Sequence, residues 1–343
     1  MKCPYDVGAI VHAGDLGETY RLVRRLGDGA SAFVYEAEDF TRGRRVALKL
    51  LRPGASPARM KREWRALQTL RHPGIVRLLS FGFTRDAHRI PYLAMPVLGG
   101  APLRTVVDGQ RALGLERGVD HGIELFDALA HAHRAGIVHR DLRPENLFLE
   151  RTAPLVHRLV LLDFGLAYAA RARVPTAQAM TGHPRYAAPE LFYSGAPTFA
   201  TDLYAAGLVV FEMLTGTHAL GATSDEWRLT HSVALPPPLE AVLPRAPPAL
   251  AALQASLLAK HARDRPPSAE ICAQTLRSIR EALPVAGNVD PTNEDGVDSV
   301  LRRIAGAAAD EITQVDAPPV SLLRQASLPD DTEVDPPSSS ESR

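Results

Sequence analysis

The stretch His139-Arg-Asp-Leu-Arg-Pro-Glu-Asn146 and the later triplet Asp163-Phe-Gly165 decide the fold that we expect for this chain. Asp141 is a carboxylate that can accept or orient the proton of an attacking hydroxyl group. Asn146 and Asp163 offer hard oxygen atoms, which Mg²⁺ prefers together with phosphate oxygens. An acid, an amide and a second acid in this order are typical of phosphoryl transfer to a hydroxyl group.

A segment with two glycines precedes these residues. Leu26-Gly-Asp-Gly29 lies between Tyr20-Arg-Leu-Val23 and Val34-Tyr-Glu-Ala37, which both have the composition of strands. We expect a hairpin in which Gly27 and Gly29 allow backbone N–H groups to approach a phosphate. Taken alone, the glycines fit a purely structural hairpin equally well.

Lys49 follows in Val46-Ala-Leu-Lys-Leu50, whose alternating pattern predicts a strand. A lysine held there can contact the α- and β-phosphates of a nucleotide. The next stretch, residues 59–70, has apolar residues on one face and predicts a helix that carries Glu63. We assign Glu63 as the ion-pair partner of Lys49, and the alternative is a solvated pair outside any site.

These motifs occur in the order in which a protein kinase carries them, and residues 20–283 resemble a bacterial eukaryotic-like Ser/Thr protein kinase domain. The resemblance implies an α+β, two-lobed protein kinase fold. Its N-lobe, residues 20–95, would be small and β-rich with one key helix, and its C-lobe, residues 96–283, would be larger and mostly helical. We expect residues 1–19 to be an N-terminal segment and residues 284–343 to be a tail.

The resemblance also assigns an ATP site. It places Val34 and Ala47 above the adenine ring, Phe148 below it and Met95 at the gatekeeper position. Pro96 lacks an N–H group, but the hinge of this family uses only the carbonyl there and takes its N–H donor from the position of Leu98. The complete set of expected ATP-binding residues is Leu26, Gly27, Gly29, Val34, Ala47, Lys49, Glu63, Met95, Pro96, Leu98 and Phe148.

In the same way the resemblance assigns the chemistry. The implied catalytic residues are Asp141, Lys49, Arg143 and Asn146. The implied metal ligands are Asn146 and Asp163, and the implied cofactors are ATP and Mg²⁺. The alternative without catalysis is that Asp141 and Asp163 are ordinary loop residues whose carboxylates cap turns.

Three residues depart from the family pattern. Ala32 replaces the third glycine of the loop, Arg143 replaces a lysine that contacts the γ-phosphate, and His183 replaces a threonine bonded to that lysine. A planar guanidinium is bulkier and differently directed than an ammonium group. These departures leave the preference for the acceptor residue open.

A peptide-docking segment extends from Gly182 to Glu190 and ends in Ala188-Pro-Glu190. The resemblance implies an ion pair between Glu190 and Arg265, and a long buried helix that starts near Asp202. Such a segment favours a protein as the substrate.

Two groups of threonines are candidate phosphosites. Arg140, beside Asp141, usually binds a phosphate on the activation segment in this family, and Thr181 and then Thr176 are the candidates there. In the tail, Thr313 and Thr332 each precede an aspartate by three residues, a pattern read by forkhead-associated domains once the threonine is phosphorylated. Chance occurrence in an acidic tail is the alternative.

The tail differs in composition from the rest of the chain. The formal net charge is zero, but residues 284–343 carry twelve Asp and Glu against four Lys and Arg and contain no aromatic residue. Such a segment buries too little apolar surface to fold, so we expect it to be disordered.

The remaining composition excludes other classes of protein. Two cysteines, Cys3 and Cys272, fit a reducing compartment, and no apolar run has the length of a membrane helix. The basic residues are scattered, so we expect no binding to nucleic acid. We therefore predict a cytoplasmic Ser/Thr protein kinase that acts on protein substrates, and we weigh two alternatives, a pseudokinase scaffold and a small-molecule phosphotransferase.

Overall fold

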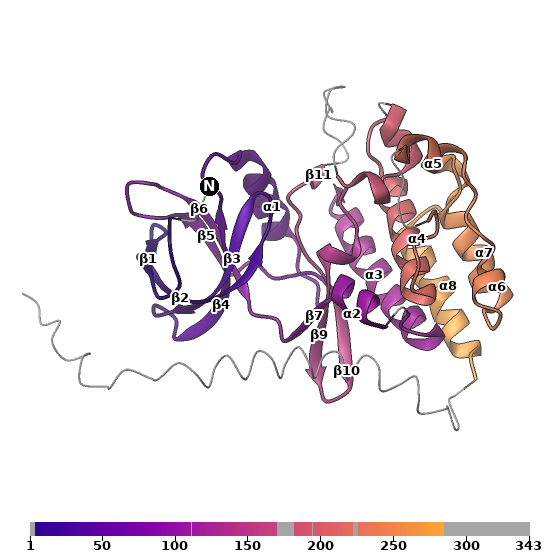
Figure 1. Cartoon of the computed structure of the whole chain (residues 1–343), viewed down its shortest axis with the longest axis horizontal. Coiled ribbons are helices and arrows are strands. Elements are labelled where there is room, and N and C mark those ends of the chain that lie inside the picture. Colours follow the sequence, from indigo (N-terminus) through magenta and orange to yellow (C-terminus); the bar gives the residue numbers. More distant parts are fainter. Residues whose placement is uncertain (1–3, 111, 170–181, 194, 222–225, 285–343) are drawn as a thin grey trace, which may run out of the picture. The chain divides into compact units, whose positions relative to one another are not determined.

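An antiparallel sheet with the strand order β1-β2-β3-β4-β6-β5 builds the N-terminal lobe (Figure 1). The structure, a computed structural model, describes residues 4–110, 112–169, 182–193, 195–221 and 226–284, and these lie in a unit that spans Met1 to Arg302. The strands of the sheet are β1 (Ile10–Ala13), β2 (Glu18–Asp28), β3 (Ala32–Asp39), β4 (Arg44–Leu51), β5 (Ser80–Phe83) and β6 (Pro91–Pro96).

Strand β4 has the alternating pattern that the sequence predicts. Val46, Leu48 and Leu50 are fully buried on one face of the sheet, whereas Ala47 and Lys49 are partly exposed on the other. Successive side chains of a strand point to opposite faces, so the apolar set holds β4 in the core. Lys49 is thereby presented on the face away from that core.

Strand β1 closes the sheet. It pairs with β2 along one edge, while Gly14 N donates to Phe83 O at 2.9 Å and Arg85 N donates to His12 O at 2.8 Å along the other. Both edges of the sheet are therefore hydrogen-bonded, which removes the exposed edges of an open sheet. The predicted domain boundary at residue 20 falls inside β2 and leaves β1 outside, although β1 is part of this sheet.

Helix α1 (Pro57–Thr69) is the helix predicted for residues 59–70. Ser56 is its N-cap, with the side chain accepting from Ala58 N, and a proline occupies the first helical position. Both features favour a helix start at this point. Met60, Glu63, Ala66 and Leu67 are buried, and α1 packs on β6.

Helices make up most of the C-terminal lobe. They are α2 (Leu103–Gln110), α3 (Leu115–Arg134), α4 (Phe199–Thr215), α5 (Trp227–Val233), α6 (Leu239–Val242), α7 (Pro248–Leu257) and α8 (Ala269–Ala282). Figure 1 shows α4 and α8 beside α3, and α3 packs against both. Residues Thr201–Leu214 of α4 are all buried, which is typical of a helix at the centre of a lobe.

Short strands carry the loops that connect these helices. One small sheet has the order β10-β9-β7, with β7 (Gly100–Pro102), β9 (Leu147–Ala153) and β10 (Val156–Leu161). A second pairs β8 (Ile137–Val138) with β11 (Tyr168–Ala169). The residues of the first motif, 139–146, therefore lie between β8 and β9, and residues 163–165 follow β10.

Candidate active site

Strand β4 and helix α1 bring Lys49 and Glu63 together. Lys49 Nζ lies 2.7 Å from both carboxylate oxygens of Glu63 and 3.5 Å from Oδ1 of Asp163. Burial by itself lowers the pKa of Lys49, but the carboxylates of Glu63 and Asp163 outweigh it and raise that pKa above its ordinary value. The ammonium group therefore stays charged, as a ligand for phosphate requires.

Asp163 sits in an unusual backbone conformation. Its φ of 48° is uncommon for a residue with a side chain. Oδ1 accepts a hydrogen bond from Gly165 N at 2.9 Å, and Phe164 between them is fully buried. Burial opposes ionisation of Asp163, but the cations Lys49 and Arg59 lower its pKa to about 2. Asp163 is therefore an ionised carboxylate at neutral pH.

Asp141 and Asn146 lie side by side in the loop 139–146. Asn146 Nδ2 donates to the backbone oxygen of Asp141 at 2.7 Å and to its Oδ2 at 3.1 Å. The short 3-10 turn Pro144–Asn146 holds the amide in this place. Because the amide nitrogen faces Asp141, the amide oxygen is the atom that can bind a metal ion.

Helix α4 holds this loop in place through Asp202. The carboxylate of Asp202 accepts from His139 N at 2.7 Å and from Arg140 N at 2.9 Å, and Arg140 adopts a φ of 71°. The His139 ring is completely buried, with Nε2 3.0 Å from Leu162 O and the ring edge against Phe164. His139 is thus a support for the loop.

The expected phosphate loop is the turn between β2 and β3. Gly27 pairs with Val34, and Gly29 N donates to Ala32 O at 3.1 Å. Arg52 Nε donates to Gly29 O at 2.7 Å, and its guanidinium lies 3.9 Å from the centre of the Phe33 ring. Arg52 follows the last residue of β4, and its contacts hold the turn in place. The sequence did not predict this role of Arg52.

The expected adenine-binding residues come from neighbouring strands. Ala47 pairs with Met95 and Val34 pairs with Lys49, so these four side chains belong to one part of the sheet. The other residues of the predicted set are distributed as follows: Leu26 in β2, Pro96 at the end of β6, Leu98 just after it and Phe148 in β9.

The amino-acid sequence of this chain is similar to that of a known protein family. Residues 20–276 match the family described as "Protein kinase domain". The chain belongs to the protein kinase family. This membership and the two lobes confirm the expected α+β fold. No helix among the described residues combines the length and the apolar character needed to cross a lipid bilayer.

Relatives of this kinase domain occur in several bacteria. The DNA damage-responsive serine/threonine-protein kinase RqkA of Deinococcus radiodurans is 38% identical over 275 residues, 78% of this chain and 40% of the relative. A serine/threonine-protein kinase of Myxococcus xanthus is 37% identical over 279 residues, 78% of this chain and 38% of the relative. The chain thus spans about two fifths of the length of these relatives. They confirm the predicted resemblance to bacterial Ser/Thr kinases.

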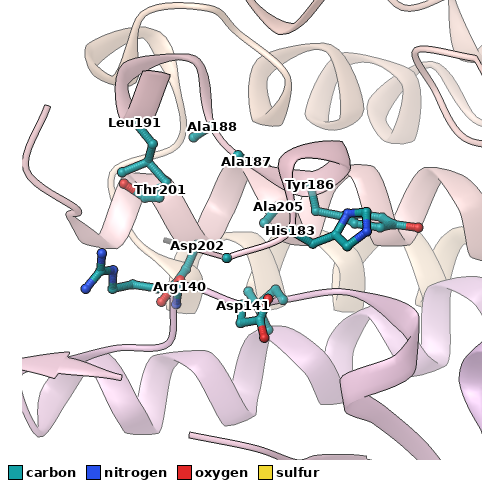
Figure 2. Close-up of a pocket in the computed structure, with 12 residues that line it drawn as sticks. Arg140, Asp141, His183, Tyr186, Ala187, Ala188, Leu191, Thr201, Asp202 and Ala205 are labelled. Carbon is teal, nitrogen blue, oxygen red and sulfur yellow. The ribbon is translucent and has the colours of Figure 1, made fainter. Parts of the chain in front are cut away.

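The two departures near Asp141 are both hydrogen-bonded or paired to neighbours. Arg143 Nε lies 3.0 Å from Glu145, and His183 Nδ1 accepts from Arg185 N at 3.3 Å. Figure 2 shows His183 and Asp141 lining the same small pocket. Loss of water contact and the charge of Arg143 lower the pKa of His183, which keeps this imidazole neutral near pH 7.

The expected anchor of the docking segment is present in this kinase domain. The guanidinium of Arg265 contacts both oxygens of Glu190, at 2.8 Å and 2.7 Å, and its side chain is fully buried. Arg265 also donates to Ala200 O at 2.8 Å. A bidentate pair of this kind ties the segment to the start of α4.

Sequence reasoning missed two contributors to the site. Arg59, one turn before Glu63 on α1, places Nη2 3.1 Å from Asp163 Oδ2 and 3.5 Å from Asp141 Oδ2. Its spacing of four residues from Glu63 is the signal that could have revealed it. The second contributor is Arg104, which donates to Tyr186 and Glu212 beneath the docking segment.

The candidate phosphosites fall outside the described residues. These are Thr176 and Thr181 before the docking segment and Thr313 and Thr332 in the tail.

Proposed function

We propose that the chain is an ATP- and Mg²⁺-dependent protein kinase that transfers the γ-phosphoryl group of ATP to serine or threonine hydroxyls of proteins. The observation that carries this proposal is the convergence of Lys49, Glu63 and Asp163 from three separate segments, with Asp141 and Asn146 close by. Family membership makes ATP the expected phosphoryl donor. The names of the relatives support serine and threonine as acceptors.

Each residue has a role in this proposal. Lys49 and the backbone of residues 27–29 hold the phosphates, and Glu63 fixes the direction of the lysine. Asp141 orients the acceptor hydroxyl and receives its proton, so that the oxygen attacks in line with the leaving group. Asp202 keeps Asp141 in place through the backbone of His139 and Arg140.

The donor set fits a hard divalent cation. Asp163 supplies an ionised carboxylate and Asn146 an amide oxygen, which are ligands that Mg²⁺ accepts together with phosphate oxygens and water. Bound there, the metal would neutralise charge that develops on the phosphates during transfer.

Arg143 would act beside the γ-phosphate, as predicted from its place in the loop. Its Nε lies 3.0 Å from the carboxylate of Glu145 as an ion pair, so the guanidinium would have to share its charge between Glu145 and a phosphate. The alternative function is a pseudokinase scaffold, which the departures Ala32, Arg143 and His183 would favour. Against it stand the groups proposed to bind phosphate and metal and to orient the acceptor hydroxyl, which lie close together.

Regulation and partners follow the sequence predictions. We propose that a phosphate on Thr181 or Thr176 binds near Arg140, that Thr313 and Thr332 recruit a forkhead-associated partner after autophosphorylation, and that the protein works in the cytoplasm. The proposed domain limits are residues 20–283 for the kinase domain, extended by β1 at its N-terminal side, and 284–343 for the tail.

The test is transfer of label from γ-labelled ATP to the chain and to a general acceptor protein, followed by identification of the labelled residues. We expect phosphoserine and phosphothreonine with the wild type and none with Asp163→Ala. Labelling of small hydroxyl compounds in place of protein would contradict the proposal, and so would nucleotide binding without any transfer.

A further inference from the structure

Arg59 is a cation placed between two carboxylates that the proposed reaction needs. Its Nη2 lies 3.1 Å from Asp163 Oδ2 and 3.5 Å from Asp141 Oδ2. Its side chain is 31% exposed, so the contacts are partly shielded from water. A single guanidinium group therefore bridges an acid of the loop 139–146 and the acid at 163.

One of these carboxylate oxygens also contacts a proposed metal ligand. Asp141 Oδ2, which Arg59 approaches, also accepts from Asn146 Nδ2 at 3.1 Å. The other oxygen of Asp163, Oδ1, accepts from Gly165 N and lies 3.5 Å from Lys49 Nζ. Arg59 thus contacts Oδ2 of Asp163, whereas Gly165 and Lys49 contact Oδ1.

The position of Arg59 is fixed by the local structure. Arg59 lies in the first turn of α1, one turn before Glu63, so the pair of Glu63 with Lys49 sets where Arg59 can reach. A side chain at Gly165 would place its Cβ 2.6 Å from Arg59 Nε, so the glycine leaves room for the arginine stem. Arg62 Nε donates to Gly165 O at 3.3 Å and holds the same segment.

We propose that Arg59 is the resident counter-ion of Asp163 and Asp141 before metal binds, and that a nucleotide-bound divalent cation must displace it. Arg59 is then a positioning residue that holds the two carboxylates by its charge, and it sets how much metal the enzyme needs. The inference rests on the proposed nucleotide and metal site.

Loss of the Arg59 guanidinium has two electrostatic consequences with opposite signs. Without metal, loss of the guanidinium leaves two carboxylates close together without their shared cation, which destabilises the fold. With metal, loss of the guanidinium removes a like charge next to the divalent cation, which strengthens metal binding. A residue that only stabilised the fold would give the first effect without the second.

The experiment measures binding of Mn²⁺ by electron paramagnetic resonance in the presence of a non-hydrolysable ATP analogue. We expect Arg59→Gln to bind Mn²⁺ roughly three- to tenfold more tightly than the wild type, a range that allows for partial solvent screening. Arg59→Lys keeps the charge and should stay close to the wild type. Arg65→Gln removes an exposed cation from the same helix and serves as the matched control, with an expected change below about twofold.

A second readout uses thermal unfolding of the same variants. In EDTA, Arg59→Gln should unfold at a lower temperature than the wild type, and addition of Mn²⁺ with the analogue should raise its unfolding temperature by more than it raises that of the wild type. Weaker Mn²⁺ binding by Arg59→Gln, or the same affinity as Arg65→Gln, would overturn the inference. A wild type that binds no Mn²⁺ with the analogue would instead overturn the proposed function beneath it.

Discussion

At the scale of single residues, the site is an arrangement of opposite charges around Lys49. The ammonium group lies between the carboxylates of Glu63 and Asp163, which have side-chain exposures of 2% and 24%. Taking such charges out of water costs free energy, and their mutual attraction offsets that cost only while both partners remain. The pair is therefore sensitive to the loss of either member.

We predict that Lys49→Met abolishes phosphoryl transfer and lowers the free energy of unfolding by about 3 kcal/mol, because Glu63 is left buried without its cation. The double variant Lys49→Met with Glu63→Leu should recover most of this stability but no activity. Urea unfolding and a transfer assay of both proteins provide the check. Arg277→Gln is the control, because the pair of Arg277 with Asp127 is exposed and should contribute less than about 1 kcal/mol.

Candidate site residues can be chosen from the sequence where the chemistry demands one residue type in a local motif. The order of Lys49, Asp141, Asn146 and Asp163 along the chain sufficed to choose these residues, and the structure brings them together. Arg59 could not be chosen in this way, because its contact with Asp163 depends on how α1 lies against residues 163–165. Sequence spacing predicts on which face of the helix Arg59 lies, but it does not predict which residues pack against that face.

At the scale of elements, the loop 139–146 depends on α4. Asp202 is 1% exposed and accepts hydrogen bonds from two consecutive backbone N–H groups of the loop, while Arg140 stays in a left-handed conformation. That conformation costs free energy and persists only because the surroundings enforce it.

We expect Asp202→Ala to lower the free energy of unfolding by about 3 kcal/mol, because two buried N–H groups lose their acceptor. The catalytic rate should fall more than about 100-fold, since relaxation of Arg140 shifts Asp141 from its position. Asp202→Asn keeps one acceptor oxygen, so its stability and its catalytic rate should lie between those of the wild type and those of Asp202→Ala. Denaturant unfolding and steady-state kinetics measure both effects, and a wild-type rate for Asp202→Ala would contradict this account of the loop.

Element prediction was good for α1 and β4 and incomplete for the start of the chain. Ser56 and Pro57 mark the helix start locally, and the alternation in β4 is visible within a few residues. Strand β1 is different, because its hydrogen bonds reach to Phe83 and Arg85, far along the chain. No local pattern in residues 10–13 indicates that closure.

At the scale of the whole molecule, two buried histidines make the stability of the fold depend on pH. His218 and His231 are 6% and 0% exposed, with ring centres 6.4 Å apart beneath the docking segment. Burial and the charge of Arg185 lower the pKa of His218 to about 4, and burial and His218 lower the pKa of His231 to about 3. Both are neutral in the folded state.

The unfolded chain binds protons at these histidines below about pH 6.5, whereas the folded chain binds them only near pH 4 and below. The contribution of these two histidines to the free energy of unfolding is therefore fully present above about pH 6.5 and is lost as the pH decreases towards 4. We predict a loss of about 2 kcal/mol per histidine between pH 7 and pH 5. Urea unfolding at both pH values should show that His231→Gln reduces this loss, whereas the exposed His261→Gln leaves it unchanged.

The sequence predicted a β-rich N-terminal lobe followed by a mostly helical C-terminal lobe, and the structure confirms both. The docking segment with its Glu190 and Arg265 pair followed from resemblance, and the structure contains that pair. The histidine pair was not predicted, because only the fold brings His218 and His231 together. Long-range packing determines their burial.

The most direct test of the central claim is the mass of the intact protein after incubation with Mg²⁺ and ATP, for the wild type and for Asp141→Asn. The account predicts added phosphate on the wild type and a rate at least about 100-fold lower for Asp141→Asn, with nucleotide binding preserved. Equal incorporation in both proteins would contradict the role of Asp141, and no incorporation in the wild type would contradict the proposal of an active protein kinase.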